Sequence, residues 1–296
     1  MSKIIVIFGP TASGKTKLSV EVASYLNAEI INADAVQIYK DVNIGSAKTT
    51  KEEMKSIKHH MIDFNSLDNK YTIYDYQKDS RKILDNLIKE NKNIVIVGGS
   101  GLYIKTLLFN YELESEIKTD LNKYERLTNE ELKSIADSYY KQNGIHINNR
   151  NRLIRFVNHY EKTNKIIKNS DEKDKLLYDA KFIGLKVDRE ELYSMINNRV
   201  DKMMESGLLK EAKKLFDKDK NTDAIIGYKE LNRYFRNEMS LKESIELIKK
   251  DSRHYAKRQY TWFINQFKDV TWVNVDYNNF NKTIEETINI LKKILI

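Results

Sequence analysis

The chain has 296 residues, with 51 Lys and Arg against 43 Asp and Glu, for a formal net charge of +8. This length suits one large domain or a domain with an insertion, and the basic excess favours a polyanionic partner. The sequence contains no cysteine, which excludes disulfides, thiolate catalysis and Cys-containing zinc sites. There is no apolar run of the roughly 18 residues that span a bilayer. We therefore expect a cytoplasmic protein without membrane attachment, and a monomer.

The first predicted strand, Ile4 to Phe8, leads directly into a glycine-containing loop and then a helix, Lys15 to Leu26. The loop matches the pattern Gly, four residues, Gly, Lys, Ser or Thr, through Gly9, Pro10, Thr11, Ala12, Ser13, Gly14, Lys15 and Thr16. Its glycines let backbone N–H groups and the helix N-terminus close around phosphate oxygens. The charge of Lys15 and the hydroxyl of Thr16, a possible Mg²⁺ ligand, complete a predicted polyphosphate site with Mg²⁺ as cofactor.

Polar residues follow two further predicted strands, Glu29 to Asn32 and Ile94 to Val97. Ligands of open parallel sheets lie outside the carboxyl ends of the strands, which makes Asp34 a candidate for the reacting centre. The alternative is a helix cap or turn residue. The second of these strands ends in glycines where many P-loop hydrolases carry an acidic residue, so a plain ATP hydrolase is disfavoured. Ser100 is available to a second ligand, and Val42 to Lys48 is a candidate rim of the site.

Glycine nearly vanishes between Tyr111 and Asp179, where the pattern is polar and helical. We predict an α/β core over residues 1–110 and 181–296, with a helical insertion domain over residues 111–180. Within the insertion, Arg152 and Arg155 share one helix face and, with Arg150, supply guanidiniums suited to phosphate. Such a charge run is more often a solvated surface.

The last third of the chain returns to a strand, Phe182 to Val187, followed by helices and a final strand, Val270 to Val275. In the long helix Leu241 to Phe267, three basic residues lie on one stripe, namely Lys250, Arg253 and Lys257. They either line a nucleic-acid channel or form the solvated back of a core-facing helix. The predicted fold class is thus α/β, a P-loop parallel sheet flanked by helices, with a helical insertion domain.

Four separated stretches together resemble the tRNA dimethylallyltransferase (tRNA isopentenyltransferase) family. They are Gly9 to Thr16, Asp34 to Tyr39 with Ile44 to Lys48, Val97 to Tyr103, and Tyr255 to Trp262 with Gly227 to Glu230. The first stretch is shared with many nucleotide kinases, but the combination in this order is specific and spans nearly the whole chain. The absence of cysteine excludes the zinc finger of eukaryotic relatives and favours the bacterial type.

The resemblance implies transfer of a dimethylallyl group from dimethylallyl diphosphate to the N6 amine of the adenosine 3′-adjacent to the anticodon of tRNA. It implies Asp34 as general base, Lys15 and Lys229 as further catalytic residues, and a diphosphate cradle of Thr11 with Ser13 to Thr16. The implied tRNA-binding residues are Asp34, Ala35, Val36, Gln37, Ser100, Asn151, Arg152, Leu153, Ile154 and Arg155. Three positions depart from the family pattern: Ala35 replaces a Ser or Thr, Ser100 a Thr, and Lys229 an Arg.

Three alternatives remain open at this point. A small-molecule kinase would share the loop and the acidic residue after the second strand, but would need neither the arginine-rich insertion nor Tyr255 to Trp262. A non-catalytic RNA-binding protein that uses a nucleotide as a switch would not need Asp34 beside the phosphates. A prenyltransferase acting on free adenine nucleotides would not need the large insertion.

Overall fold

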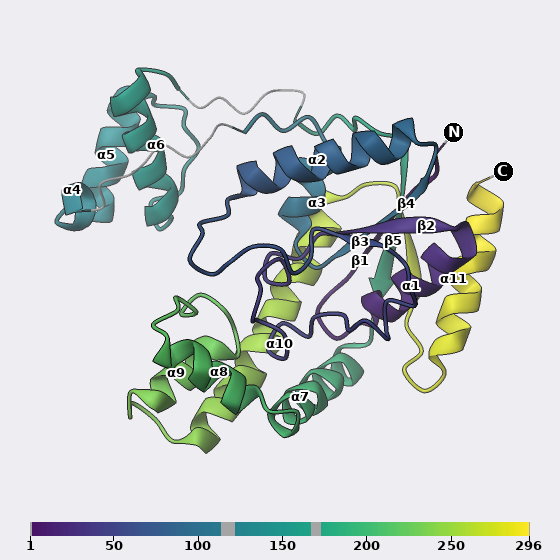
Figure 1. Ribbon diagram of the computed structural model, residues 1–296. Helices are drawn as coiled ribbons and strands as arrows, with labels where there is room; N and C mark the ends of the chain where they lie inside the picture. Colours follow the sequence, from purple (N-terminus) through teal and green to yellow (C-terminus); the bar gives the residue numbers. More distant parts are fainter. Residues whose placement is uncertain (1, 114–121, 167–172, 296) are drawn as a thin grey trace. The chain divides into compact units, whose positions relative to one another are not determined.

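The computed structural model describes residues 2–113, 122–166 and 173–295 (Figure 1). Its strands are β1 (Ile4–Phe8), β2 (Ala28–Asn32), β3 (His59–His60), β4 (Asn93–Gly98), β5 (Ala180–Lys186) and β6 (Val270–Asn274). Its helices are α1 (Lys15–Leu26), α2 (Ile73–Lys89), α3 (Gly101–Leu108), α4 (Asn122–Glu125), α5 (Asn129–Tyr139), α6 (Arg150–Thr163), α7 (Arg189–Glu205), α8 (Leu208–Asp217), α9 (Tyr228–Phe235), α10 (Leu241–Gln266) and α11 (Phe280–Ile294).

All six strands form one parallel sheet in the order β3-β2-β4-β1-β5-β6. The central strand β1 is buried over its whole length, with Ile4 opposite Ile94 of β4 and Ala180 of β5. Continuous apolar strands of this kind are typical of parallel sheets covered on both faces. The predicted α/β class with a parallel sheet is therefore confirmed. The edge strand β3 was not predicted, because two residues are too few to show a pattern.

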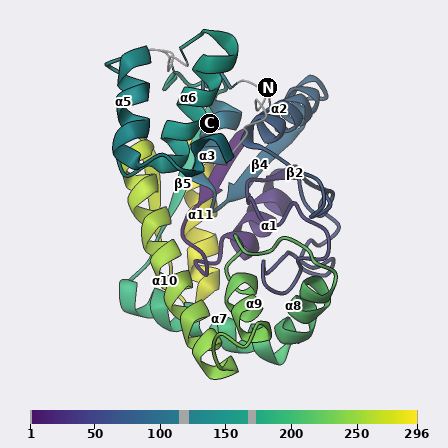
Figure 2. The same ribbon diagram turned by 90° about the vertical axis from the view of Figure 1, so that its left-hand side faces the viewer.

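Helices cover both faces of the sheet (Figures 1 and 2). On one face, buried residues of α1 and α11, such as Leu18 and Leu291, share a core with Ile7 of β1. On the other face, Phe8 lies 4.7 Å from Phe263 of α10 between ring centroids, and the Tyr76 hydroxyl of α2 donates to Asn32 O at 3.1 Å. Because successive side chains of β1 point to opposite faces of the sheet, this strand contributes to the core on each face.

Helices α7 to α10 form a second apolar cluster beyond the carboxyl ends of the strands. Leu208, Tyr228, Leu231 and Ile248 are buried there, and Val42 from the loop after β2 is buried with them. This cluster anchors the loop that follows the second strand. As a result, helices α7 to α10 and the loop after β2 lie together at the carboxyl ends of the strands.

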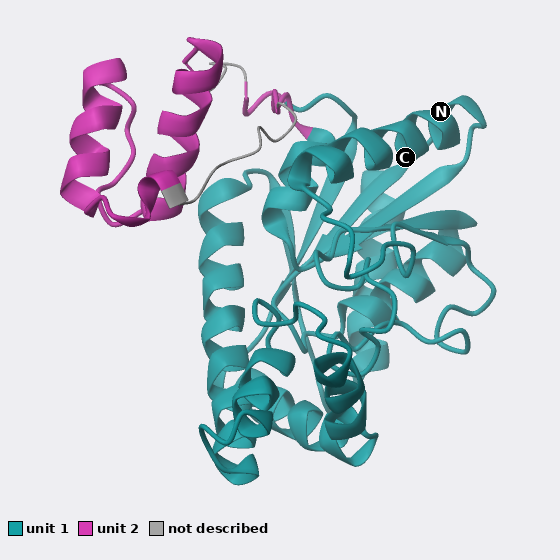
Figure 3. Ribbon diagram, turned by 60° about the vertical axis from the view of Figure 1, so that its left-hand side comes forward, with its two compact units in different colours: residues 1–108, 176–296 teal, residues 109–175 magenta. Residues whose placement is uncertain are grey.

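The chain divides into two compact units, residues 1–108 with 176–296 and residues 109–175 (Figure 3). The described part of the second unit is helical and has its own core, in which Leu132, Leu153 and Val157 are fully buried. Parts of the predicted insertion, 114–121 and 167–172, lie outside the described residues. The boundaries differ from the predicted ones by a few residues. Residues 176–180 belong to the first unit, since Leu177 N donates to Leu108 O at 2.9 Å and Tyr178 to Asp85 at 3.0 Å, and residues 109–110 belong to the second.

Across the three described stretches, none of the helices combines the length and apolar character needed to cross a bilayer.

Candidate active site

A cavity of about 480 Å³ opens at the carboxyl ends of β1 and β2 within the first unit. Its wall is formed by the loop before α1, the segment after β2, and side chains from α7 and α10. Thr11, Lys15, Asp34, Arg199 and Tyr255 all line it. The fold therefore brings together three of the four stretches that carry the family resemblance, namely Gly9 to Thr16, Asp34 to Tyr39 with Ile44 to Lys48, and Tyr255 to Trp262 with Gly227 to Glu230. Helix α7 adds residues that the sequence did not indicate.

The loop Gly9 to Thr16 turns through two left-handed residues, Ala12 at φ 62° and Gly14 at φ 84°. A Cβ on Gly14 would lie 2.3 Å from the Phe280 ring, so both conformation and space require glycine there. Ser13 is buried, and its N–H donates to Pro10 O at 3.3 Å. Helix α1 begins directly after the turn, so its first N–H groups have no acceptor within the helix and suit an anion.

Two side chains from distant parts of the chain hold this loop. Gln259 of α10 accepts from Thr11 N–H at 2.8 Å and donates to Gly99 O at 2.9 Å, which ties the loop to the end of β4. The hydroxyl of Tyr277, after β6, donates to Ala12 O at 3.0 Å. Both contacts fix peptide groups next to the left-handed turn, so the loop's shape depends on residues far away in sequence.

Lys15 lies at the base of the cavity, where its ammonium donates to Pro10 O at 2.6 Å. Burial among protein atoms, assisted by the charge of Arg199, lowers the pKa of Lys15 to about 7, and Asp34 opposes this shift. A bound anion would favour the protonated form of a lysine whose pKa is lowered in this way. The geometry thus suits phosphate oxygens at Lys15.

Asp34 makes the contacts of a turn residue and also lines the cavity. Its Oδ1 accepts from Val36 N–H at 2.9 Å and Gln37 N–H at 3.3 Å, as in a turn cap. Its Oδ2 has no hydrogen-bond donor among the described residues, and the carboxylate lines the cavity. One oxygen is therefore held in place while the other is available to a ligand.

Residues beside Asp34 connect the ends of β2 and β4. The Ala35 N–H donates to the Ser100 hydroxyl oxygen at 3.1 Å, a contact made by backbone that does not need the missing hydroxyl at position 35. Gln37 donates through Nε2 to Ser46 O and Ala47 O, both at 3.2 Å. Val36 and Gln37 line the cavity with the segment 45–47, which is the rim that the sequence indicated.

Arg199 of α7 is a site residue that sequence reasoning missed. Its Nη1 donates to the Thr11 hydroxyl at 3.0 Å, and its guanidinium forms no ion pair within the described residues. Burial lowers the pKa of Arg199, and the charge of Asp34 partly offsets this effect. In the sequence Arg199 stands in a polar helical run, where a single arginine looks like any solvated residue.

Lys229 lines the same cavity but is engaged by carboxylates. Its Nζ lies 2.7 Å from Asp251 Oδ2 and 3.4 Å from Glu230 Oε1. Desolvation alone would lower the pKa of Lys229, yet the bond to Asp251 and the charge of Glu230 outweigh it and raise the pKa. Its positive charge is largely offset within the protein, unlike that of Arg199.

Oxygen ligands for a hard cation meet beside the loop. No cluster of three or more His, Asp or Glu suited to a metal occurs in the part of the chain that the structure describes. Thr16 and Asp34, however, share a small polar recess of about 30 Å³ with Asn32. Hydroxyl and carboxylate oxygens are the donors that Mg²⁺ prefers, and Mg²⁺ takes its remaining ligands from substrate phosphates and water. The residues present fit that ion.

The predicted arginine segment lies on α6 in the second unit. Leu153 and Ile154 are buried in that unit's core, which leaves Asn151, Arg152 and Arg155 exposed. Arg150 does not add a third free guanidinium as expected, since it donates to Leu127 O at 2.7 Å and to Tyr124 O at 2.6 Å. The Arg150 side chain therefore caps the end of α4.

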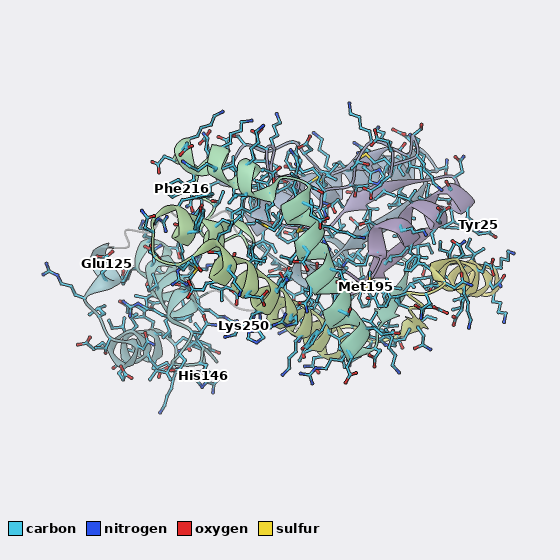
Figure 4. The ribbon with its side chains drawn as sticks, turned by 90° about the horizontal axis from the view of Figure 1, so that it is seen from below. Tyr25, Glu125, His146, Met195, Phe216 and Lys250 are labelled. Carbon is cyan, nitrogen blue, oxygen red and sulfur yellow. The ribbon has the colours of Figure 1, made fainter. Side chains whose placement is uncertain are left out.

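The three residues of the predicted basic stripe on α10 differ in their contacts. Arg253 donates to Asn197 Oδ1 of α7 at 2.6 Å and so joins two helices. Lys250 and Lys257 are exposed, and Figure 4 shows Lys250 on the outer side of α10. The adjacent face of the same helix carries Tyr255 into the cavity, where burial and the charge of Asp34 raise its pKa to about 12.

Comparison with known proteins shows the family to which this chain belongs. A family model for IPP transferases matches residues 37–266. The tRNA dimethylallyltransferase of Anoxybacillus flavithermus is 38% identical over 98% of this chain and 96% of that protein. The Bacillus cereus tRNA dimethylallyltransferase is 41% identical over 92% of this chain and 90% of that protein.

Solved structures agree with the sequence relatives. The tRNA delta(2)-isopentenylpyrophosphate transferase of Staphylococcus epidermidis has a TM-score of 0.74 at 38% identity, covering 99% of both chains. A eukaryotic dimethylallyltransferase acting on tRNA has a TM-score of 0.85 at 25% identity, over 99% of this chain and 79% of that one. The chain belongs to the IPP transferase family, whose curated relatives are tRNA dimethylallyltransferases.

Proposed function

We propose that this chain transfers the dimethylallyl group of dimethylallyl diphosphate to the N6 amine of the adenosine 3′-adjacent to the anticodon in tRNA. It is a prenyl-transferring enzyme by family, and the relatives named above act on tRNA. One observation supports the proposed reaction in particular. The carboxylate of Asp34, with Oδ1 hydrogen-bonded and Oδ2 available, lines the same cavity as Lys15 and Arg199. A base and an anion site side by side are what this reaction needs.

The diphosphate is assigned to the loop side of the cavity. The N–H groups at the start of α1, Lys15 and Arg199 surround the space where its oxygens would lie. Charge that develops on the leaving oxygens is met there by cations already in position. Arg199 suits this role better than Lys229, because Lys229 is neutralised by Asp251.

The transfer exchanges a carbon–oxygen bond for a carbon–nitrogen bond and moves one proton from the amine to a carboxylate. The N6 nitrogen attacks the allylic carbon, the carbon–oxygen bond breaks, and its electron pair leaves with the diphosphate. The amine proton passes to Oδ2 of Asp34, while Oδ1 stays bonded to Val36 N–H and Gln37 N–H. Thr16 would hold Mg²⁺ beside the diphosphate, and the ion would supply further neutralisation of the leaving charge.

The target base must leave its stack to reach Asp34. Extrusion is easiest from a single-stranded loop such as the anticodon loop. Val36, Gln37 and Ser100 lie beside Asp34 and would hold the extruded adenine, while Asn151, Arg152 and Arg155 of the second unit would contact the RNA backbone.

The decisive experiment incubates the protein with Mg²⁺, labelled dimethylallyl diphosphate and unmodified tRNA, with labelled ATP as a parallel donor. Asp34→Asn keeps an acceptor for the two backbone N–H groups but cannot take the proton, so we expect a loss of about 10²- to 10⁴-fold in kcat with tRNA binding largely intact. Asp188→Asn is the matched control, because Asp188 also accepts two backbone N–H groups but caps α7 outside the cavity. Near-normal turnover by Asp34→Asn, or consumption of ATP in place of the isoprenoid, would contradict the proposal.

A further inference from the structure

A second groove, of about 540 Å³, lies on α10 outside the reaction cavity. All of its lining residues fall between His254 and Gln266, and we call it the Trp262 groove after the single large apolar side chain in its lining. Lys257 and Arg258 line it and are exposed, and no acidic residue does. An aromatic surface flanked by cations suits a base joined to a phosphate.

The indole of Trp262 is held from behind by the protein. Gly101, the first residue of α3, lies so close that a Cβ there would be 2.0 Å from the indole ring. Phe263 and Phe267 contact the indole edge to face, with centroids 5.9 Å and 5.6 Å away. Because these neighbours fix the ring, little rotamer freedom is lost when a ligand stacks on its open side.

The Trp262 groove adjoins the reaction cavity along α10. Arg258 lines both, and its guanidinium lies 5.8 Å from the ring of Tyr255, which faces the cavity. Tyr255 and Trp262 are seven residues apart, which corresponds to about 10 Å along a helix. Gly101, behind the indole, directly follows Ser100, which contacts the backbone beside Asp34.

We propose that the Trp262 groove binds the nucleotide next to the target adenosine, with its base stacked on the indole and its phosphate beside Lys257 and Arg258. This inference rests on the proposed function, since it takes an RNA base as the occupant of the cavity. Dimethylallyl diphosphate could also meet the cations through its diphosphate, but that group is assigned to the loop side of the reaction cavity, and its five-carbon chain has no aromatic face to stack on the indole. A nucleotide uses all three groups at once.

Fluorescence tests this assignment directly, because the chain has two tryptophans, Trp262 and Trp272. In a Trp272→Phe background, all indole emission comes from Trp262. The probes are an unmodified anticodon stem-loop RNA and two matched RNAs that are abasic at the nucleotide 5′ or 3′ to the target adenosine. We expect the intact RNA to quench Trp262, and one abasic RNA to lose the quenching and bind about 5- to 150-fold more weakly. Equal quenching by all three RNAs, or quenching by dimethylallyl diphosphate alone, would overturn the proposal.

Variants at the groove give an independent readout. Trp262→Phe keeps an aromatic face and should still distinguish intact from abasic RNA, whereas Trp262→Leu should bind both equally. Lys257→Gln should lower the salt dependence of RNA binding, and Lys292→Gln on α11, also exposed, should not. Discrimination that survives in Trp262→Leu would count against stacking. If Trp262→Leu fails to fold, the fluorescence measurement decides, because it keeps Trp262.

Prenylated product is measured on the same RNAs to separate this proposal from the proposed function. Quenching that depends on the flanking nucleotide without any product from the intact RNA would leave the groove standing and refute the proposed reaction. Product formation without nucleotide-dependent quenching would do the reverse.

Discussion

The charge state of Lys15 links the cavity to pH. Its pKa is lowered to about 7 in the folded protein, so between about pH 7 and its ordinary value of 10.5 the folded chain binds fewer protons than the unfolded chain. By linkage, Lys15 adds stability as pH rises through that window and removes it as pH falls toward 7. A bound diphosphate would raise the pKa of Lys15 again, because its negative charge favours the ammonium form.

We therefore expect diphosphate affinity to fall as pH rises above about 7, with proton uptake on binding. Isothermal titration with inorganic pyrophosphate in buffers of different ionisation enthalpy measures that uptake. It should vanish in Lys15→Met and persist in Lys17→Met, an exposed neighbour on α1. Uptake that is unchanged in Lys15→Met would assign the titration to another group.

In the part of the chain that the structure describes, Lys229 forms ion pairs and Arg199 does not, so we expect their loss to affect different properties. Arg199→Met removes a cation with no carboxylate partner among the described residues, so pyrophosphate affinity should fall about 10- to 150-fold, as for loss of a charged hydrogen bond. Lys229→Met leaves Asp251 and the buried Glu230 without their cation and should mainly lower Tm. Calorimetry and thermal unfolding of both variants check this. A larger affinity loss in Lys229→Met would reverse the assignment.

At the scale of elements, the loop before α1 takes its shape from parts of the chain that are remote in sequence. Gln259 of α10 is 248 residues from Thr11, and Tyr277, between β6 and α11, is 265 residues from Ala12. Ala12 adopts a left-handed φ that a non-glycine residue rarely adopts without support. The last βα connection therefore acts as a positioning element for the anion site.

Removing one of these supports should loosen the loop without touching substrate. For Tyr277→Phe we expect the KM for dimethylallyl diphosphate to rise about 2- to 13-fold, the value of one ordinary hydrogen bond, with kcat changing less. Tyr25→Phe is the matched control, since Tyr25 is exposed on α1 (Figure 4). Steady-state kinetics at varied diphosphate measures the split. A fall in kcat alone would show that the hydroxyl acts in another way.

At the scale of the whole molecule, the net charge of +8 lies almost wholly in the first unit, because residues 109–175 carry 13 Lys and Arg against 12 Asp and Glu. RNA binding by the second unit therefore depends on individual side chains rather than on its net charge. We expect Arg152→Gln with Arg155→Gln to weaken tRNA binding and to lower the slope of log affinity against log salt by about 1.4, at roughly 0.7 per phosphate contact. Lys141→Gln, exposed in the same unit, is the control and should leave the slope nearly unchanged. Filter binding across a salt series measures both. An unaltered slope in the double variant would place the RNA elsewhere.

Features that depend on neighbouring residues could be predicted from the amino-acid sequence alone. The apolar runs of β1, β4 and β5 predicted a parallel sheet, and the change of composition near Tyr111 predicted a helical insertion. The loop pattern Gly9 to Thr16 and the position of Asp34 after a strand pointed to the carboxyl end of that sheet. Each of these signals is local, because strand pairing class, turns and helix starts follow from residue types a few positions apart.

The folded structure was needed to show which distant side chains complete the cavity and which of the predicted side chains are already bonded to other protein groups. It brought Arg199 to Thr11, 188 residues away, and paired Lys229 with Asp251. It also buried Leu153 and Ile154 in the core of the second unit. The physical reason is that a charged residue on a helix looks the same in sequence whether it faces solvent, a carboxylate or a ligand, and packing alone selects among them.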